Sequence, residues 1–351
     1  MVLDAQPVEI LSSPNKILVI QTAFPGDSIL TLPFIQELKK LDESREIDVV
    51  STPASAAIFK SSPSVSKVFP FQKRGEHRGI RGMLKFASFL RSENYSTVYS
   101  LHRSIRTALL VNLIHPDYST GFSNSSFKFV YDKLVEYEYN SHEVKRSLKF
   151  LGEYSGEEWK IFPKMEASQV EIDNVVRFKE ENGLAGDYVV IAPGSVWNTK
   201  RYPVKYFAEI AASLISKKLR VIISGSENEK DMGEEIVGIA GKEVINGCGQ
   251  FSIVESVELF RGAKLVITND SAPTHFSMAA DAPVLTIYCS TVPEFGFYGY
   301  SPKSYYISKA VSCKPCGIHG HKKCPNGSFE CGTSIYPFEV LKKVEEILYV
   351  G

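Results

Sequence analysis

The stretch that decides the fold is residues 16–41, KILVIQTAFPGDSILTLPFIQELKKL. Its first part, KILVIQT, is a continuous apolar run, which is typical of a strand buried on both faces of a parallel sheet. The part from Asp27 to Leu41 repeats apolar side chains at helical spacing. A buried strand followed directly by a helix predicts one β–α unit of a doubly wound sheet.

The same alternation of strand and helix is repeated in two series along the chain. The first series ends near Phe122, and a helix is expected over 142–156. Residues 157–169 are polar and without a clear period, which predicts a hinge. The alternation restarts at Tyr188 and continues to Ser290. We therefore expect an α/β protein with two Rossmann-like parallel-sheet domains, over 1–160 and 161–336, facing across a cleft.

The composition is that of a soluble globular protein, with 44% apolar and 23% charged residues. Forty basic and forty acidic residues leave no net charge, which argues against general nucleic-acid binding. No window approaches 18 uninterrupted apolar residues, and the start MVLDAQPVEI lacks the pattern of a signal peptide. We expect a cytoplasmic protein whose six cysteines are thiols or metal ligands.

Ligands of open α/β sheets bind beyond the carboxyl ends of the strands. In the first half, FPGDS places Gly26 and Asp27 at such an end. Gly26 permits a tight turn with positive φ. Asp27 is either the N-cap of a helix that begins at Ser28 or an acceptor for the proton of a substrate hydroxyl.

In the second half, the expected strands end at Ser195, Ser226, Gly247 and Asp270, which would lie along one edge. APGSVWNTKRYP offers small hydroxyl residues and Lys200, which suit a phosphate, although a basic pair is often plain surface charge.

SGSENEKD reads as a capping box of Ser226 with Glu229. The neighbouring Glu227 could instead bind ribose hydroxyls.

TNDSAPTH carries more polar side chains than a helix start requires. Asp270 or Ser271 would cap the helix, and the remaining N–H groups would form an anion site. His275 lies one turn further on, and its role stays open.

The stretch CKPCGIHGHKKCPNGSFEC contains Cys313, Cys316, Cys324 and Cys331. The first pair has the C-x2-C spacing of a zinc site, but the second pair is seven residues apart, with His319 and His321 as alternative ligands. The stretch is either a structural zinc site or a compact loop with buried thiols.

Between Lys73 and Arg106 the first half has eight basic residues against Glu76 and Glu93. Such a local patch on a neutral protein predicts an acidic ligand or an anionic membrane surface. The eight are Lys73, Arg74, Arg78, Arg81, Lys85, Arg91, Arg103 and Arg106.

Taken in order, these motifs resemble the lipopolysaccharide heptosyltransferases of glycosyltransferase family 9. The resemblance covers nearly the whole chain and is carried by residues 16–38, 192–211, 223–229 and 266–295, together with the CKPC…CPNG…C pattern. It implies a GT-B fold whose last helix, 337–351, crosses back to the first domain. It also implies an inverting transfer of heptose from ADP-heptose to the inner core of lipopolysaccharide, without a cofactor, at the cytoplasmic face of the inner membrane.

The resemblance also assigns roles to residues of this chain. Asp27 matches the general base, Lys200 the residue that holds the donor phosphates, and Glu227 a position near the adenosine ribose. Asp270 matches a contact to the sugar hydroxyls. Arg103 and Arg106 of the basic patch would meet the lipid A-linked acceptor, and the remaining donor contacts would come from Ser195, Ser271, Ala272 and His275.

The chain departs from the family pattern at Ala272, where glycine is common, and at Cys289. A transferase for another nucleotide sugar used in surface glycan assembly is therefore the alternative enzyme. A non-catalytic binding module with a zinc-held interaction site is the alternative of another class. A nicotinamide dehydrogenase is disfavoured, because no G-x-G-x-x-G follows the first strand.

Overall fold

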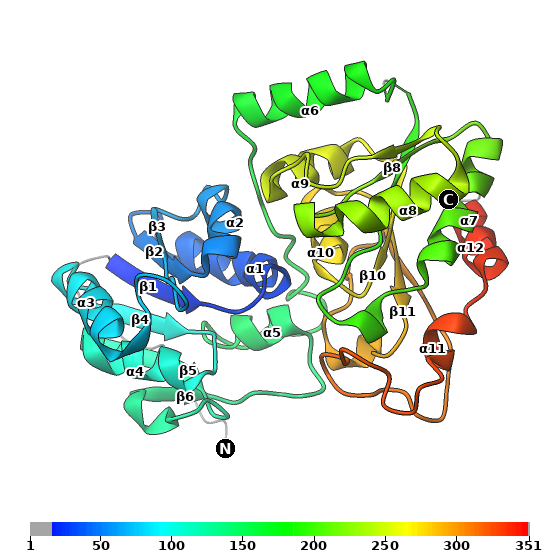
Figure 1. The fold of residues 1–351 in the computed structure, drawn as a ribbon. Helices are drawn as coiled ribbons and strands as arrows, with labels where there is room; N and C mark the ends of the chain where they lie inside the picture. The colour runs from blue at the N-terminus through cyan, green and yellow to red at the C-terminus, as the bar shows by residue number, and fades with distance from the viewer. Residues whose placement is uncertain (1–15, 185, 350–351) are drawn as a thin grey trace.

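The computed structural model describes residues 16–184 and 186–349, and therefore not the start of the chain to which the signal-peptide prediction refers. It contains two six-stranded sheets, with the strand orders β3-β2-β1-β4-β5-β6 and β12-β11-β10-β7-β8-β9 (Figure 1). All strand pairs in the described residues are parallel. Both sheets have the Rossmann order, which confirms the predicted fold class.

The N-terminal domain is built on the first sheet. Its strands are β1 (Lys16–Gln21), β2 (Glu46–Ser51), β3 (Lys67–Pro70), β4 (Thr97–Ser100), β5 (Tyr118–Phe122) and β6 (Lys133–Val135). Its helices are α1 (Pro25–Leu41), α2 (Ala56–Lys60), α3 (Gly79–Ser92), α4 (Ile105–Ile114) and α5 (Glu143–Leu148), with short 3-10 turns η1 (Pro53–Ser55) and η2 (Lys128–Val130).

The C-terminal domain is built on the second sheet. Its strands are β7 (Tyr188–Ala192), β8 (Arg220–Ile223), β9 (Val244–Asn246), β10 (Leu265–Asn269), β11 (Val284–Tyr288) and β12 (Ser304–Ser308). Its helices are α6 (Gln169–Glu181), α7 (Val204–Ser216), α8 (Lys230–Ala240), α9 (Ile253–Arg261), α10 (Ala272–Ala279), α11 (Glu330–Thr333) and α12 (Pro337–Tyr349). Its 3-10 turns are η3 (Asn198–Lys200), η4 (Glu227–Glu229) and η5 (Pro293–Phe295).

Helix α12 contradicts the expected return of the last helix to the N-terminal domain. It packs on α7, and Figure 1 shows it on the far side of the C-terminal domain. Val340 and Val344 are buried in an apolar cluster that also contains Leu214 of α7. Because this face of α12 is already covered, the helix belongs to the C-terminal domain.

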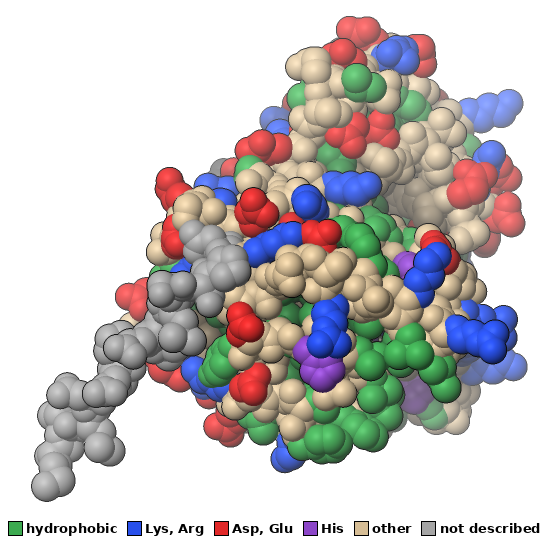
Figure 2. Space-filling model, turned by 90° about the vertical axis from the view of Figure 1, so that its left-hand side faces the viewer, with side chains coloured by type: hydrophobic (Ala, Val, Ile, Leu, Met, Phe, Trp, Pro, Cys, Tyr) green, Lys and Arg blue, Asp and Glu red, His purple; other side chains and the backbone are tan. Residues whose placement is uncertain are grey.

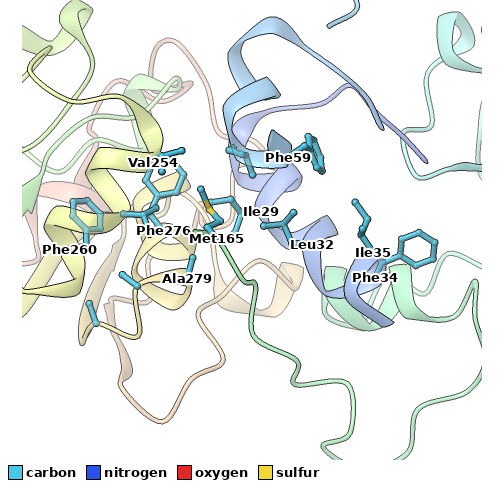
Figure 3. Close-up of a cluster of buried hydrophobic side chains, with 14 of the residues drawn as sticks. Ile29, Leu32, Phe34, Ile35, Phe59, Met165, Val254, Phe260, Phe276 and Ala279 are labelled. Atoms are coloured by element: carbon cyan, nitrogen blue, oxygen red, sulfur yellow. The ribbon is translucent and has the colours of Figure 1, made fainter. Parts of the chain in front are cut away.

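One apolar cluster continues from the N-terminal domain into the C-terminal domain. Ile29 and Leu32 of α1 belong to the same cluster as Val254 of α9 and Phe276 of α10. Figure 3 shows Met165, from the segment between the domains, lying between these two groups. Helices α1 and α10 are thereby packed together, which turns the carboxyl ends of the two sheets toward each other.

Candidate active site

Two cavities open where the strand order of each sheet reverses, as expected for ligand sites of this architecture. The β7–β10 cavity has a volume of about 390 Å³ and is lined by residues that follow β7 and β10. The β1–β4 cavity has a volume of about 750 Å³ and is lined by residues that follow β1 and β4. Within the described residues, four line both cavities: Phe24, Pro25, Asp27 and His319.

Asp27 lies in the first turn of α1, where the two cavities meet. The helix begins at Pro25, so Asp27 is not the predicted N-cap, and its carboxylate instead accepts the N–H of Phe24 at 3.2 Å. Burial and the Glu143 carboxylate raise its pKa to about 7, against the opposing effects of the Phe24 N–H and Arg103. A carboxylate with a pKa near neutrality is well matched to accept a proton from a hydroxyl.

Gly26 is required for a reason other than the predicted one. Its backbone is helical and not in the positive-φ region. A Cβ atom at this position would lie 3.3 Å from Cδ2 of His275 and 3.7 Å from Cα of Ala272. The missing side chain therefore allows α1 to approach the start of α10.

Lys200 and Asp270 form an ion pair in the β7–β10 cavity. The Lys200 ammonium lies 2.6 Å from Oδ2 of Asp270, and the Thr291 hydroxyl donates to the same oxygen at 2.6 Å. Both side chains line the cavity, as predicted, together with Ser195. The pair holds the Lys200 ammonium, with its charge balanced by Asp270, beside the start of α10.

The start of α10 does not have the predicted cap. Ser271 is at the N-cap position but makes no side-chain cap, and the Asp270 carboxylate is bound by Lys200 and Thr291 instead. Ser271 and Ala272 line the cavity. A helix start that neither predicted side chain covers is suited to bind an anionic group.

His275 is 5% exposed and lies between Gly26 and the cavity. Burial and the nearby Lys200 charge lower its pKa to about 3, so the ring is neutral at pH 7. Its Nδ1 has no hydrogen-bond partner among the residues that the structure describes. The ring thus places an unused polar atom close to the cavity.

The predicted capping box of Ser226 and Glu229 is confirmed, because the backbone N–H and the hydroxyl of Ser226 both donate to Oε2 of Glu229. Glu229 also lines the β7–β10 cavity, a position that the sequence did not predict. The side chain of Glu227 is 72% exposed and lies outside the residues that line this cavity. The structure therefore does not bring Glu227 to the cavity with the other predicted donor residues.

The β1–β4 cavity contains the basic residues Lys73, Arg74 and Arg103. The Lys73 ammonium donates to the carbonyl and the hydroxyl of Thr22, both at 2.9 Å. Burial and the Arg106 charge lower its pKa to about 8. Arg106 does not line the cavity, and its guanidinium donates to the Lys73 carbonyl at 3.3 Å. Of the two predicted acceptor residues, only Arg103 reaches the cavity.

The four cysteines of the C-terminal stretch do not form a metal site in this arrangement. Among residues 16–184 and 186–349, no three His, Cys, Asp or Glu side chains are placed to share a metal ion. Cys331 is buried in the apolar cluster of the C-terminal domain, whereas Cys313 is exposed. The Cys324 thiol donates to the Asn326 side chain at 2.9 Å. Of these four thiols only that of Cys331 is buried, so the zinc site and the compact loop with buried thiols both stay predictions.

Two Rossmann-ordered parallel sheets with facing cavities are the architecture of the GT-B fold. The sequence matches the model of glycosyltransferase family 9 (heptosyltransferase) over residues 83–327, and the chain belongs to this family. It is therefore a glycosyltransferase.

The similar proteins agree with this assignment. The chain is 23% identical to lipopolysaccharide heptosyltransferase 2 of Salmonella typhimurium, over 95% of this chain and 98% of that protein. Its fold is similar to a glycosyltransferase family 9 structure from Veillonella parvula, with a TM-score of 0.84 and 22% identity over 97% and 99% of the two chains. It is also similar to E. coli ADP-heptose lps heptosyltransferase II, with a TM-score of 0.77 and 21% identity over 95% and 98% of the chains.

Proposed function

We propose that this glycosyltransferase transfers heptose from ADP-heptose to the inner core of lipopolysaccharide, with inversion at the anomeric carbon. The observation that carries the proposal is the position of Asp27 between a cavity with an open helix start and a cavity with basic side chains. The curated relatives support the transferred heptose and the lipopolysaccharide acceptor, because lipopolysaccharide heptosyltransferases 1 and 2 of several bacteria match most of the chain.

In the proposed reaction, an acceptor hydroxyl attacks the anomeric carbon while its proton moves to Asp27. The bond between the anomeric carbon and the diphosphate oxygen breaks, and its electron pair leaves with ADP. Lys200 and the start of α10 stabilise the charge that develops on this oxygen, so the step needs no added divalent metal. When the diphosphate binds Lys200, Asp270 becomes available to accept hydrogen bonds from the sugar. A ribose contact by Glu227 would require its side chain to turn toward the cavity.

The β1–β4 cavity would hold the acceptor. Lys73, Arg74 and Arg103 give it the positive charge that phosphates and acid sugars of a lipid A-linked core require. Arg106 supports this site indirectly, because it binds the backbone of Lys73.

We also propose that the N-terminal domain contacts the anionic cytoplasmic face of the inner membrane, where such an acceptor would be anchored. None of the helices in the described residues has the length and apolar character needed to cross a membrane. Helix α3 instead exposes Ile80 and Leu84, by 74% and 46%, beside the basic residues Arg81 and Lys85. Figure 2 shows hydrophobic and basic side chains intermixed on the face of this domain. Apolar side chains with flanking cations are the combination that binds anionic bilayers.

The test is a transfer assay with a panel of nucleotide sugars and an inner-core acceptor. ADP-heptose should give the highest kcat/KM, with release of ADP and a gain of one heptose in the acceptor mass. A higher kcat/KM with another nucleotide sugar would replace the proposed donor with the alternative one.

A further inference from the structure

The segment between β12 and α11, residues 309–329, is here called the cysteine loop, and it is attached to the turn that carries Lys200. The His321 N–H donates to the Thr199 hydroxyl at 2.8 Å, and the Thr199 N–H donates to the His321 carbonyl at 3.1 Å. The Asn198 side chain donates to the Lys322 carbonyl at 3.0 Å. Three hydrogen bonds therefore join the loop to η3 at the edge of the β7–β10 cavity.

This attachment places His319 between the two cavities. Of the four residues that line both, Phe24, Pro25 and Asp27 come from the start of α1, and His319 comes from the cysteine loop. Among the described residues of the C-terminal domain, only His319 lines the β1–β4 cavity, which it shares with Asp27. Its ring stacks with that of Trp197, with centroids 6.3 Å apart and planes at 20°.

The charged neighbours of His319 determine what it can bind. Burial and the charges of Lys200 and Arg103 lower its pKa, while Asp270 opposes them. The ring is therefore neutral at pH 7, with one N–H donor and one acceptor nitrogen. A sugar hydroxyl, which both donates and accepts, fits this ring better than a phosphate, which requires donors only.

We propose that His319 binds a sugar hydroxyl at the point where the transferred sugar and the acceptor meet, beside Asp27. The inference rests on the proposed function, because it assumes that both cavities are filled by sugar substrates. It also gives the cysteine loop a role in the site, since the loop holds the His319 ring between the two cavities.

The test compares two substitutions of His319 with a matched histidine elsewhere. His319→Phe keeps an aromatic ring to stack on Trp197 but removes both hydrogen-bonding atoms, whereas His319→Gln keeps a donor and an acceptor. The control is His115→Asn, because His115 is exposed and lies outside the lining of both cavities. Each variant is measured for kcat and KM of donor and acceptor, for ADP affinity by calorimetry, and for melting temperature.

His319 is exposed in the free protein, and His319→Phe should lower kcat/KM roughly tenfold, the effect of one lost hydrogen bond between its ring and a substrate hydroxyl. Its ADP affinity and melting temperature should match those of the wild type, and His319→Gln should recover part of the loss.

A kcat/KM of His319→Phe within twofold of the wild type would overturn the inference. An equal loss of ADP affinity would overturn it too, because it would place the ring on the nucleotide. A wild type that transfers nothing from ADP-heptose would contradict the proposed donor alone. The variants would then be compared with the nucleotide sugar that the panel identifies.

Discussion

At the scale of single residues, the Asp27 carboxylate accepts the Phe24 N–H at the start of α1 and has a pKa that suits a general base. Asp27→Asn keeps an oxygen for the Phe24 N–H, so melting temperature and ADP affinity should be nearly unchanged. Turnover should fall by a factor on the order of 10²–10⁴, because an amide cannot take the proton. Rates, melting curves and calorimetry on one preparation check this.

The pH profile of the wild type gives a second check on the same carboxylate. Its pKa is raised to about 7, and only the ionised form is a base. The value of kcat/KM should therefore rise with pH through about 7 and level off above it. Full turnover of Asp27→Asn, or a profile that is flat through this range, would leave Asp27 with a structural role only.

Lys200→Ala should weaken ADP binding more than AMP binding, because the ammonium is proposed to hold the diphosphate. The substitution removes a charged hydrogen bond worth roughly 1.5–3 kcal/mol. It also leaves the Asp270 carboxylate in the cavity with the Thr291 hydroxyl but without its cation. Calorimetric titration with both nucleotides measures the difference.

The matched control is Lys205→Ala, because Lys205 is exposed and outside both cavities. Equal losses for ADP and AMP in Lys200→Ala would place Lys200 away from the diphosphate.

Some of these residues could be predicted from the sequence and others could not. Lys200, Asp270 and His275 follow buried strands, so their place at one sheet edge follows from the alternation of strand and helix. His319 and Lys73 lie in segments without a period, and only the folded chain brings them to the cavities. Glu229 was predicted as a cap, and the cap is correct, but a local pattern cannot show that the same side chain also faces a ligand site.

At the scale of elements, the contact between the cysteine loop and η3 makes Gly320 a sensitive position. Gly320 has φ +74°, and a Cβ there would lie 2.9 Å from the Thr199 hydroxyl and 3.2 Å from Cγ of Lys200. Gly320→Ala should push the loop away from η3 and lower both ADP affinity and turnover.

Gly327→Ala is the matched control, because Gly327 has φ +76° and open space around its Cα. Both variants have the same backbone strain, roughly 1–2 kcal/mol, so only the contact with η3 differs. Equal effects in the two variants would show that the loop does not support the site.

The protein should bind vesicles of phosphatidylglycerol and phosphatidylethanolamine through helix α3, and the binding should weaken as the salt concentration rises. The double variant Arg81→Glu/Lys85→Glu should reduce this binding at least about tenfold, because each basic side chain near an anionic surface contributes about 1 kcal/mol. Co-sedimentation measures the bound fraction. Lys205→Glu/Lys342→Glu, with both residues exposed on the C-terminal domain, serves as the control. Equal losses in the two double variants would remove α3 from the contact.

The elements that the sequence did not predict have weak apolar patterns. Helix α6 has only Val175 fully buried, so its apolar pattern is weak, and it begins at the end of the predicted hinge. Strands β6 and β12 are short edge strands with half-exposed side chains, and they lack the apolar run of the central strands. The position of α12 depends on its packing on α7, and the repeat of apolar residues along a helix does not predict which element it packs on.

At the scale of the whole molecule, the shared apolar cluster couples the two domains. Because Ile29 and Leu32 are buried against residues of the C-terminal domain, we expect a single calorimetric unfolding transition. Saturating ADP should raise the temperature of the entire transition, although the proposed nucleotide contacts lie mainly in one domain. Two resolved transitions, of which ADP shifts only one, would show that the domains unfold independently.

The packing of α1 on α10 also restricts how products can leave. Separating the domains like jaws would expose Ile29, Leu32 and Phe276 to water, at a cost of roughly 1.5–3 kcal/mol for each side chain. We therefore expect the domains to move by a rotation that keeps these side chains covered. Gly26, which lets the two helices approach each other, lies within this contact. Product release would accordingly leave the apolar contact between α1 and α10 in place, and Asp27 is one residue away from Gly26 in this contact.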